Sequence, residues 1–590
     1  MCGFFTVISK GKIDEKQFSL SLNKINHRGP DNQKIKFYKI DKINFALGFN
    51  RLSIQDPIER SDQPFSLDNQ KILMFNGEIY NFNDLIKKNN LKTLTRSDTE
   101  VFYKILCEKN TNSFEELNGM WAITFFDFIN KKVILSRDRY GQKPLYYFLD
   151  NNILIISSSP QSINYYLGSV LNFNKKTVTE YMEFGFNYNN KSLFNKITKV
   201  ENSSFELFDF NKWKFTKKEK YFNHSDIVHN QNSLTNLKND LSAAVNRTLI
   251  SDRPVGLLLS GGIDSQMILR LAEQSDKNFN INYYCMYHDE SDLDYVNTKL
   301  VADQLKLNVN FIKDPGKMSL SKFKEICKFQ HNLFPLIGSV VSSNQIYEKI
   351  SQTNTKVVLD GCGADEIFAG YDYRYFFPFL RQLFRDEKYI KFIKELKQVN
   401  KQYYVFYLKD LIKSIFPYLK KFRKKNKYLK ENIIENNDPI FKKKFAFKEL
   451  LKIESFEGRL GLYLSHLDEN SMMYGLENRS PFLDKEIIKY LNSNYEDKIF
   501  NGSYKDELKN VLRSFDLPKN FITNKKKGLS STSLNNFFDT NKTSLTDQIM
   551  DSQIIKDVGY SDLIYRDIKK NNIDNVTFSR LSVTAVMEQQ

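Results

Sequence analysis

The turn Ser260-Gly261-Gly262 has the residue types of an anion-binding site. An apolar run from Val255 ends there and an amphipathic pattern begins at Ile263, so we expect a buried strand to turn sharply into a helix. Glycines let the backbone approach a ligand closely, and the start of a helix offers unpaired N–H groups. The hydroxyl groups of Ser260 and Ser265 add further donors.

Asp264, which follows the same turn, could hold Mg²⁺ against phosphate oxygens. The alternative explanation is a plain strand–helix connection whose glycines serve packing. The turn is not a Walker A loop, because no Gly-x-x-x-x-Gly-Lys-Ser/Thr occurs in the chain. We therefore predict a phosphate loop of another kind, formed by Ser260, Gly261, Gly262, Asp264 and Ser265.

Cys2 directly follows the initiator methionine, and its small side chain permits removal of Met1. The free α-amine of Cys2, with a pKa near 8, would then accept the thiol proton directly or through water. One residue would thus supply both nucleophile and base. The alternative is an ordinary, inert residue at position 2.

Polar and glycine-containing turns between short alternating strands follow Cys2 through roughly two hundred residues. These turns are His27–Asp31, Asn50–Ile54, Gln63-Pro64, Asn76–Asn81, Ser97–Glu100 and Arg137–Tyr147. In order and spacing they resemble the class II glutamine amidotransferase domain, an N-terminal-nucleophile hydrolase with two stacked antiparallel sheets between helices. The resemblance implies that Cys2 attacks the side-chain amide of glutamine, forms a thioester and releases ammonia.

The same resemblance implies roles for five further residues. Asn76 and the main-chain N–H of Gly77 match the oxyanion hole. Arg51 matches the residue that binds the substrate α-carboxylate, and Glu78 and Asp98 match the positions that hold the α-amine. For each of the charged residues the alternative is a solvated surface charge.

Downstream of residue 233 the expected elements alternate between helices and strands, with strands at residues 280–287 and 355–360 and a helix near residues 296–305. This alternation predicts a doubly wound parallel sheet with its ligand at the carboxyl ends of the strands. The loop at Ser260 resembles the pyrophosphate loop of ATP pyrophosphatases. Together with the upstream domain, the chain resembles glutamine-hydrolysing asparagine synthetases from Cys2 to about Ser530, with matching motifs at residues 357–371, 468–484, 509–513 and 526–528.

The second resemblance implies that ATP and Mg²⁺ activate the carboxylate of aspartate as a mixed anhydride with AMP. Residues 260–265 would hold the leaving pyrophosphate, Asp264 and Asp365 would hold Mg²⁺, and Lys526 would neutralise the developing charge. For Lys526, within Lys525–Lys527, the alternative is a solvated basic turn.

The loop that should face the acceptor departs from better-known asparagine synthetases. Cys362 stands where those enzymes have an acidic residue, thought to act as a base, and a thiol with a pKa near 8.5 is a poor substitute. Asp360 stands where they have serine, and an acidic-Pro signature expected near residue 332 is absent. Glu366 is a candidate for the missing base. For Cys362 the alternative is a small residue that fills a gap beside the loop.

Composition narrows the remaining choices. Hydrophobic residues at 41% and no apolar run of about 18 residues indicate a globular protein without a membrane span, which we expect in the cytoplasm. We attribute the net charge of +17 to a solvated lysine surface, because no nucleic-acid-binding motif accompanies it. The five cysteines lack the spacing of disulfide or zinc frameworks. Helices with a basic face at residues 375–450 could dock on an acidic partner or membrane surface.

We therefore predict an α+β N-terminal-nucleophile hydrolase domain at residues 1–205 and a linker at residues 206–232. An α/β doubly wound parallel-sheet domain with helical additions should follow at residues 233–590. The expected partners are glutamine, aspartate and ATP, and a homodimer is compatible with the sequence. Three interpretations stay open: an asparagine-forming amidotransferase, a relative that amidates another carboxylate such as a sugar acid, and a catalytically weakened regulatory homologue.

Overall fold

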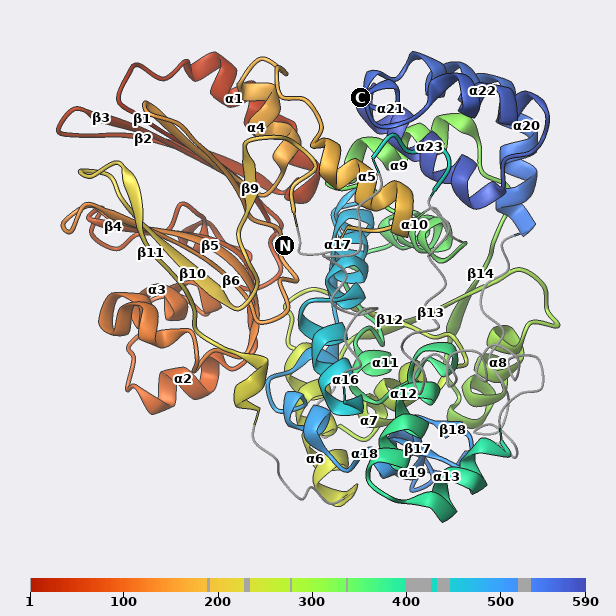
Figure 1. Cartoon of the computed structure of the whole chain (residues 1–590). Helices are drawn as coiled ribbons and strands as arrows, with labels where there is room; N and C mark the ends of the chain where they lie inside the picture. Colours follow the sequence, from red (N-terminus) through yellow and green to blue (C-terminus); the bar gives the residue numbers. More distant parts are fainter. Residues whose placement is uncertain are drawn as a thin grey trace.

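The chain forms two domains that lie side by side in the computed structural model (Figure 1). The structure describes residues 2–187, 191–227, 234–275, 279–335, 338–398, 426–431, 446–517 and 532–589. Warm colours mark the first domain, in which two sheets stack, and green to blue colours mark the second.

Two antiparallel sheets form the centre of the first domain. The first has the order β2 (Asn32–Ile40), β3 (Ile43–Arg51), β1 (Gly3–Ser9), β8 (Ile153–Ser157), β7 (Tyr146–Leu149) and β9 (Ile197–Lys199). The second has the order β11 (Lys214–Lys220), β10 (Ser204–Asp209), β6 (Lys132–Arg137), β5 (Gly119–Asp127) and β4 (Lys71–Ile79).

Alternating side chains place the core of this domain in layers. On β1, Phe4 belongs to the cluster between the two sheets, whereas Phe5 packs on Phe18 of helix α1. The helices are α1 (Glu15–Asn23), α4 (Pro160–Tyr166) and α5 (Lys175–Phe184) on the first sheet's side, and α2 (Phe82–Lys88) and α3 (Asp98–Lys109) on the second's. The predicted fold of stacked antiparallel sheets between helices is confirmed.

Residues 206–220 lie in the second sheet, although the sequence suggested that they belong to a linker. Strand β10 pairs with β6, and β11 pairs with β10. The sequence Lys214–Lys220 reads as a polar linker because β11 is the outermost strand of its sheet and most of its side chains are exposed. We therefore place the end of the first domain after Lys220.

A five-stranded parallel sheet forms the centre of the second domain, in the order β14 (Val309–Lys313), β13 (Ile281–Tyr287), β12 (Val255–Leu258), β15 (Val357–Leu359) and β16 (Glu477–Arg479). All four neighbouring pairs are parallel. Helices α6 (Leu234–Thr248), α7 (Ile263–Glu273), α8 (Leu293–Leu305), α9 (Leu320–Phe329) and α10 (Gly338–Ser351) belong to the alternating part. The predicted doubly wound domain and its strands near residues 280–287 and 355–360 are confirmed.

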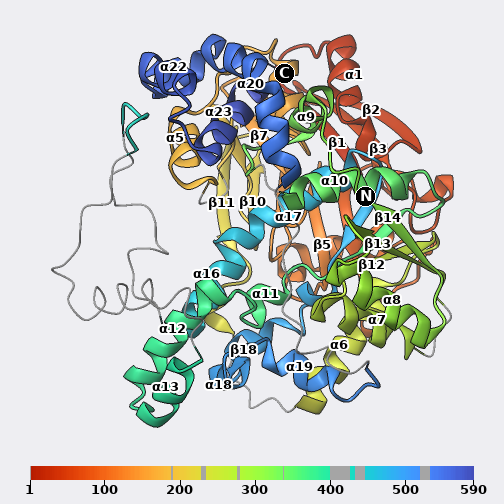
Figure 2. The same cartoon turned by 90° about the vertical axis from the view of Figure 1, so that its right-hand side faces the viewer.

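Further helices complete the second domain (Figure 2). They are α11 (Ala364–Ile367), α12 (Asp372–Arg385), α13 (Tyr389–Leu396), α16 (Phe447–Phe456), α17 (Arg459–Met472), α18 (Tyr495–Lys498), α19 (Asp506–Leu512), α20 (Thr532–Asp551), α21 (Gln553–Val558), α22 (Ser561–Lys569) and α23 (Asn575–Glu588). Of these, α20 to α23 lie apart from the sheet, beside α5 and α9. A two-stranded hairpin joins β17 (Ile499–Phe500) to β18 (Ser503–Tyr504).

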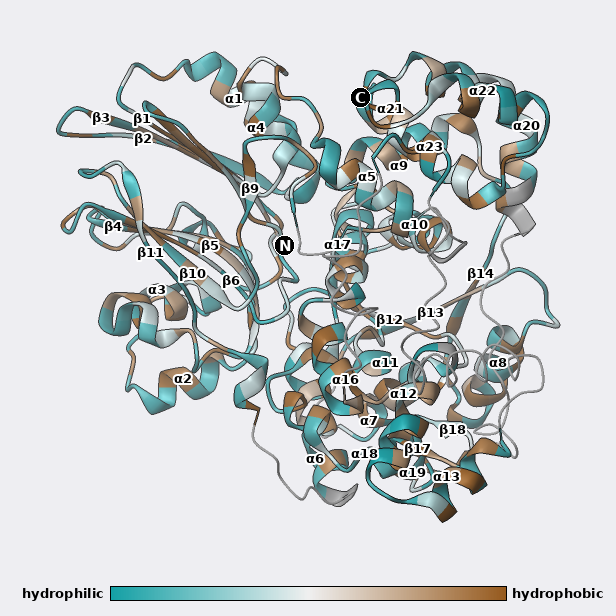
Figure 3. Cartoon of the chain, viewed as in Figure 1, coloured by the Kyte–Doolittle hydropathy of each residue, from teal (hydrophilic) through white to brown (hydrophobic). Residues whose placement is uncertain are grey.

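The two domains share a hydrophobic core. Val178 and Tyr181 of α5 belong to the same buried cluster as Leu581 and Val586 of α23. In Figure 3, which colours the ribbon by hydropathy, brown hydrophobic segments run along the central strands, and the outer loops are mostly teal and hydrophilic. Because an apolar interface of this kind resists separation, the C-terminal helices fix the first domain against the second.

None of the helices in the described parts of the chain combines the length and the apolar character that a membrane crossing requires. The basic stretch at residues 375–450 includes most of α12, all of α13 and the first residues of α16. Residues 399–425 and 432–445 of that stretch lie outside the described residues. Its predicted docking role stays a prediction.

Candidate active sites

Cys2 lies at the start of β1, where the ends of the two antiparallel sheets meet. Its backbone N–H donates to Oδ1 of Asn76 on β4 at 3.0 Å, which joins the strands of different sheets. The thiol is buried, and burial raises its pKa above the ordinary value. The Nδ2 of Asn76 is buried and has no hydrogen-bond partner within the described residues. A donor left unpaired beside a nucleophile suits an oxyanion hole.

Position 77 has room for glycine only. It has φ of 153°, and an added Cβ would lie 2.0 Å from the carbonyl oxygen of Met120 on the neighbouring strand β5. The close approach fixes the peptide that follows Asn76. The predicted role of the Gly77 N–H as a second oxyanion donor stays a prediction that this geometry supports.

Three buried carboxylates surround one guanidinium next to Cys2. Glu78 and Asp98 come from the first domain, and Glu477 and Arg479 come from β16 of the second. Arg479 contacts Glu477 at 2.6 Å and Glu78 at 3.3 Å. Burial, together with the neighbouring carboxylate Asp98, raises the pKa of Glu78, and burial raises that of Asp98 to about 6. The excess of negative charge would favour a bound cation such as an α-ammonium group.

Arg51 has a different environment from the one that the sequence suggested. Its two terminal nitrogens donate to Asp62 at 2.6 Å and to the carbonyl oxygens of Gln55, Asp56 and Ile58. These contacts hold the loop that follows β3, and Gln55 of this loop in turn donates to Glu78. Arg51 thus positions the wall of the site, and its binding of a substrate carboxylate stays a prediction.

The second site lies at the carboxyl end of β12, in the middle of the parallel sheet. Strand β12 ends at Leu258, and α7 begins after Gly262, which caps the helix without a side-chain hydrogen bond. The hydroxyl group of Ser265 accepts from the Ser260 N–H at 3.2 Å and closes the loop. Gly261 has φ of 55°, and an added Cβ would lie 2.9 Å from Asn297. The loop therefore has the tight glycine turn and open helix start of an anion site.

Asp264 of α7 and Asp365 of α11 converge on a single ammonium group. Lys505 Nζ lies 2.6 Å from Asp264 Oδ2 and 2.5 Å from Asp365 Oδ1. Although burial lowers its pKa, the two carboxylates raise the pKa of Lys505 above the ordinary value. An added Cβ at Gly370 would lie 1.8 Å from Asp365 Oδ1, and one at Gly361 would lie 2.6 Å from the Cβ of Asp264. Only glycines leave room for this cluster.

The donor set fits Mg²⁺ in the presence of a polyphosphate. No group of three or more metal-ligating side chains occurs in the described part of the chain. Mg²⁺, however, is commonly held by one or two carboxylates together with phosphate oxygens and water. Asp264 and Asp365 satisfy that requirement. Lys526, the predicted catalytic lysine, lies outside the described residues.

The loop after β15 places Asp360 and Cys362 at the same edge of the sheet. Asp360 accepts hydrogen bonds from Ser480 Oγ at 2.7 Å, from Asn478 Nδ2 at 3.0 Å and from the Cys362 N–H at 3.0 Å. These contacts give Asp360 a structural role. Burial and the charge of Asp360 raise the pKa of the Cys362 thiol well above its usual range, so the thiol stays neutral.

Glu366, on α11, has the properties of a base that Cys362 lacks. It is buried, accepts a hydrogen bond from Tyr371 Oη at 3.0 Å, and burial raises its pKa to about 8. A carboxylate with this pKa takes up a proton readily near neutral pH. The site therefore contains one candidate base despite the substitution at position 362.

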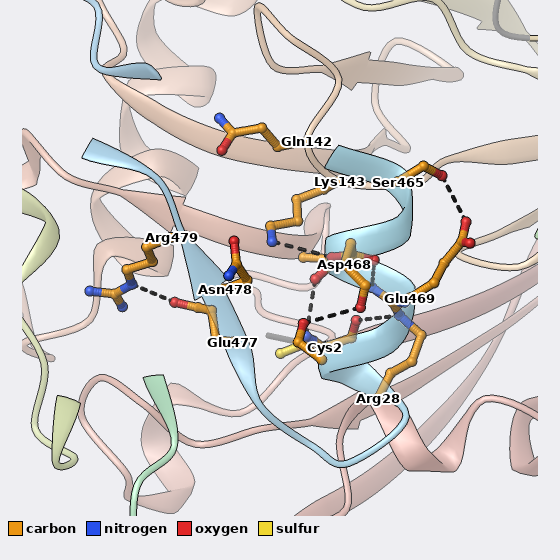
Figure 4. A network of polar contacts seen from close by, with 12 residues as sticks. Cys2, Arg28, Gln142, Lys143, Ser465, Asp468, Glu469, Glu477, Asn478 and Arg479 are labelled. Carbon is orange, nitrogen blue, oxygen red and sulfur yellow. Dashed lines mark hydrogen bonds and ion pairs between the residues drawn. The ribbon is translucent and has the colours of Figure 1, made fainter. Parts of the chain in front are cut away.

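A network of polar contacts joins Cys2 to helix α17 of the second domain (Figure 4). Asp468 of α17 accepts from Arg28 at 2.9 Å and from Lys143 at 3.3 Å, and Arg28 Nε donates to the Cys2 carbonyl at 3.3 Å. On β16, Glu477 and Arg479 face the Cys2 site, whereas Asn478 between them contacts Asp360. This alternation follows the two-residue period of a strand.

The sequence interpretation missed Lys505 and gave no role to Asp468, Glu477 or Arg479. A signal for the last three was present, because they lie within the motif at residues 468–484. Lys505 offered no such signal.

The comparisons with known proteins agree with this architecture. Residues 1–222 match the model of the glutamine amidotransferase domain, and residues 236–576 match that of asparagine synthase. A relative in Methanocaldococcus jannaschii is 32% identical over 404 residues, which cover 63% of this chain and 76% of the relative. One in Acanthamoeba polyphaga mimivirus is 28% identical over 63% of this chain and 68% of its own length. A relative in Bacillus subtilis is 29% identical over 63% of this chain and 59% of its own length. All three carry the name of glutamine-hydrolysing asparagine synthetase.

Proposed function

The chain belongs to the asparagine synthase family. We propose that it transfers the amide nitrogen of glutamine to the side-chain carboxylate of aspartate, which ATP activates first. The products would be asparagine, glutamate, AMP and pyrophosphate. The observation that carries the proposal is the pairing of two sites across one interface: a buried thiol beside an unpaired amide donor, and a phosphate loop beside two converging aspartates.

In the first half-reaction, the Cys2 sulfur attacks the side-chain amide carbon of glutamine. After removal of Met1, the α-amine of Cys2 would take the thiol proton and give it to the leaving nitrogen. Asn76 Nδ2 and the Gly77 N–H would stabilise the oxyanion, and the carboxylates of Glu78 and Asp98 would hold the α-ammonium group of glutamine. Water then cleaves the thioester and releases glutamate.

In the second half-reaction, a carboxylate oxygen of the acceptor attacks the α-phosphorus of ATP, and the bond to the β-phosphate breaks. The loop of residues 260–265 would hold the leaving pyrophosphate, with Lys505 next to it. Mg²⁺, held by Asp264 and Asp365, would supply charge neutralisation on the phosphates. Ammonia from the first site then attacks the acyl carbon, AMP leaves, and Glu366 accepts the proton.

The acceptor is tested by measuring pyrophosphate release and amide formation with purified protein, ATP, Mg²⁺ and glutamine. We expect aspartate to stimulate pyrophosphate release at least about tenfold over the reaction without acceptor, with one amide formed per pyrophosphate. Glutamate formation without any acceptor-dependent pyrophosphate would contradict the proposal.

A second acceptor is favoured by one specific observation. Because the Cys362 thiol stays neutral, the loop has one negative charge fewer than one with an acidic residue at position 362, and Glu366 is its candidate base among the described residues. A larger carboxylic acid, such as a sugar acid, would be compatible with this loop. A panel of such acids in the same assay separates the alternatives, since the best acceptor is the one with the highest kcat/KM.

We predict that glutamine affinity falls on acidification through pH 6. Asp98 has a pKa of about 6, and its carboxyl group must lose its proton to hold an ammonium group. Titration calorimetry of glutamine into a Cys2→Ala variant should show roughly tenfold weaker binding at pH 5 than at pH 7. In a Cys2→Ala, Asp98→Asn double variant we expect weak binding at both pH values; an unchanged pH profile would exclude Asp98 as the titrating group.

A further inference from the structure

A pocket separate from both sites lies between the domains, where β9 and β11 of the first domain meet the start of α17. Its volume is about 310 Å³, enough for a small metabolite. Three lysines line it, namely Lys191, Lys199 and Lys220. None of these residues has a role in the proposed reaction.

Lys199 is the unusual member of the group. Its side chain is buried, with the residue 8% exposed, and it has neither a hydrogen bond nor an ion pair within the described part of the chain. Its Nζ lies 5.7 Å from the centroid of the Tyr146 ring. Burial, and then the positive charge of Arg137, lower its pKa to about 7. An ammonium group removed from water with no carboxylate in ion-pair contact is costly, and an anion in the pocket would offset that cost.

Other donors converge on the same space. Both amide atoms of Asn187 are buried and lack hydrogen-bond partners among the described residues. Helix α17 has 14 residues, and its cap, Gly458, provides no side-chain hydrogen bond. At Gly461, in its first turn, nothing lies within 4 Å of an added Cβ, so the helix start is open to the pocket. The positive end of the helix dipole adds to the charge of Lys199.

One wall of the pocket is flat and apolar. The rings of Tyr140 and Phe456 stack with centroids 4.9 Å apart and planes inclined by 7°. Glu201 and Glu457 also line the pocket, and Glu457 contacts His224 at 3.1 Å. We propose that the pocket binds a small organic anion, with its carboxylate or phosphate at Lys199 and the start of α17, and its flat apolar part against Tyr140 and Phe456.

The surroundings of Lys199 give the binding a characteristic pH dependence. Arg137 of β6 faces its ammonium group, and so do Asp468 and Glu469 of α17, Tyr146 of β7 and His331. Asp468 is already paired with Arg28 and Lys143, and Glu469 accepts from Ser465 at 2.7 Å. A bound anion would keep Lys199 protonated, so binding takes up a proton above pH 7 and weakens as the pH rises.

The test uses the full-length protein and two probes with the same ring, benzoate and phenyl phosphate, in titration calorimetry. Benzoate stays ionised above pH 6, so it reports the pH dependence; we expect about tenfold weaker binding at pH 8.5 than at pH 6.5. The tighter of the two probes identifies the head group as carboxylate or phosphate. The site is independent of the proposed function, so this result does not depend on any turnover.

Three variants make the test decisive. Lys199→Met should weaken binding of the better probe at least about tenfold, and Lys199→Arg should retain binding while losing its pH dependence. Lys220→Met, which removes an exposed lysine of the same pocket, is the matched control and should change affinity less than about threefold. The proposal is overturned if neither probe binds, or if Lys199→Met binds as the unchanged protein does.

Discussion

Replacement of Cys2 by alanine should lower the rate of glutamine-dependent amide formation at least about 1,000-fold. The rate of ammonia-dependent amide formation should stay within about threefold of that of the unchanged protein. The thiol is the only nucleophile that the structure places beside Asn76, among the described residues. Its removal leaves the phosphate loop, Asp264 and Asp365 untouched, because they belong to the other domain. Pyrophosphate release and amide product, measured with either glutamine or an ammonium salt, check the prediction.

The matched control for this experiment is Cys107→Ala. Cys107 is a partly buried thiol of the same domain, on α3, and it lies outside the site. This variant should keep both activities. Loss of ammonia-dependent synthesis in Cys2→Ala would contradict the assignment of two separate sites, and residual glutamine use would contradict the assignment of the nucleophile.

The fold and most of the Cys2 site were predictable from sequence, since they rest on local patterns. The polar, glycine-containing segment Asn76-Gly77 was expected in a turn, but it lies within strand β4, where a carbonyl oxygen 2.0 Å from an added Cβ requires the glycine at 77. Ser260-Gly261-Gly262 was expected to join a strand to a helix, and one strand ends and one helix begins there. In each case the chemistry depends on neighbouring residues in the chain.

Contacts between distant residues could not be predicted in this way. Lys505 lies 241 residues from Asp264, and nothing in its local sequence distinguishes it from the other lysines. The sequence of strand β11 resembles that of a linker because an edge strand needs few apolar side chains. The contacts of Arg51 could not be predicted either, because the carbonyl oxygens that it binds come from a loop whose path the sequence does not define.

Strand β16 explains how one segment serves both sites. Glu477 and Arg479 lie on the side of Cys2, and Asn478 lies on the side of Asp360, so a shift of the strand by one residue would exchange these side chains between the sites. Hydrogen bonds to β15 on one side and the ion pair with Glu78 on the other fix its register.

Replacement of Lys505 by methionine should reduce pyrophosphate release about 100- to 1,000-fold, with either glutamine or ammonia as nitrogen donor. Lys505 is the ammonium group that the described residues place between Asp264 and Asp365, directly beside the phosphate loop. It would neutralise the charge that develops on pyrophosphate when the bond between the phosphates breaks. Glutaminase activity at Cys2, measured as glutamate formation, should remain.

A second measurement separates this role from a purely structural one. Without Lys505, the two carboxylates repel each other, and Mg²⁺ would join them in place of the ammonium group. Mg²⁺ should therefore raise the melting temperature of Lys505→Met more than that of the unchanged protein. Lys498→Met is the comparison, because Lys498 is also buried but pairs with Glu507 at 3.1 Å and donates to the carbonyl oxygens of Ile367 and Tyr490, not to Asp264 or Asp365. That variant should lose stability and gain no response to Mg²⁺; an equal response in both variants would contradict a shared cation site at Asp264 and Asp365.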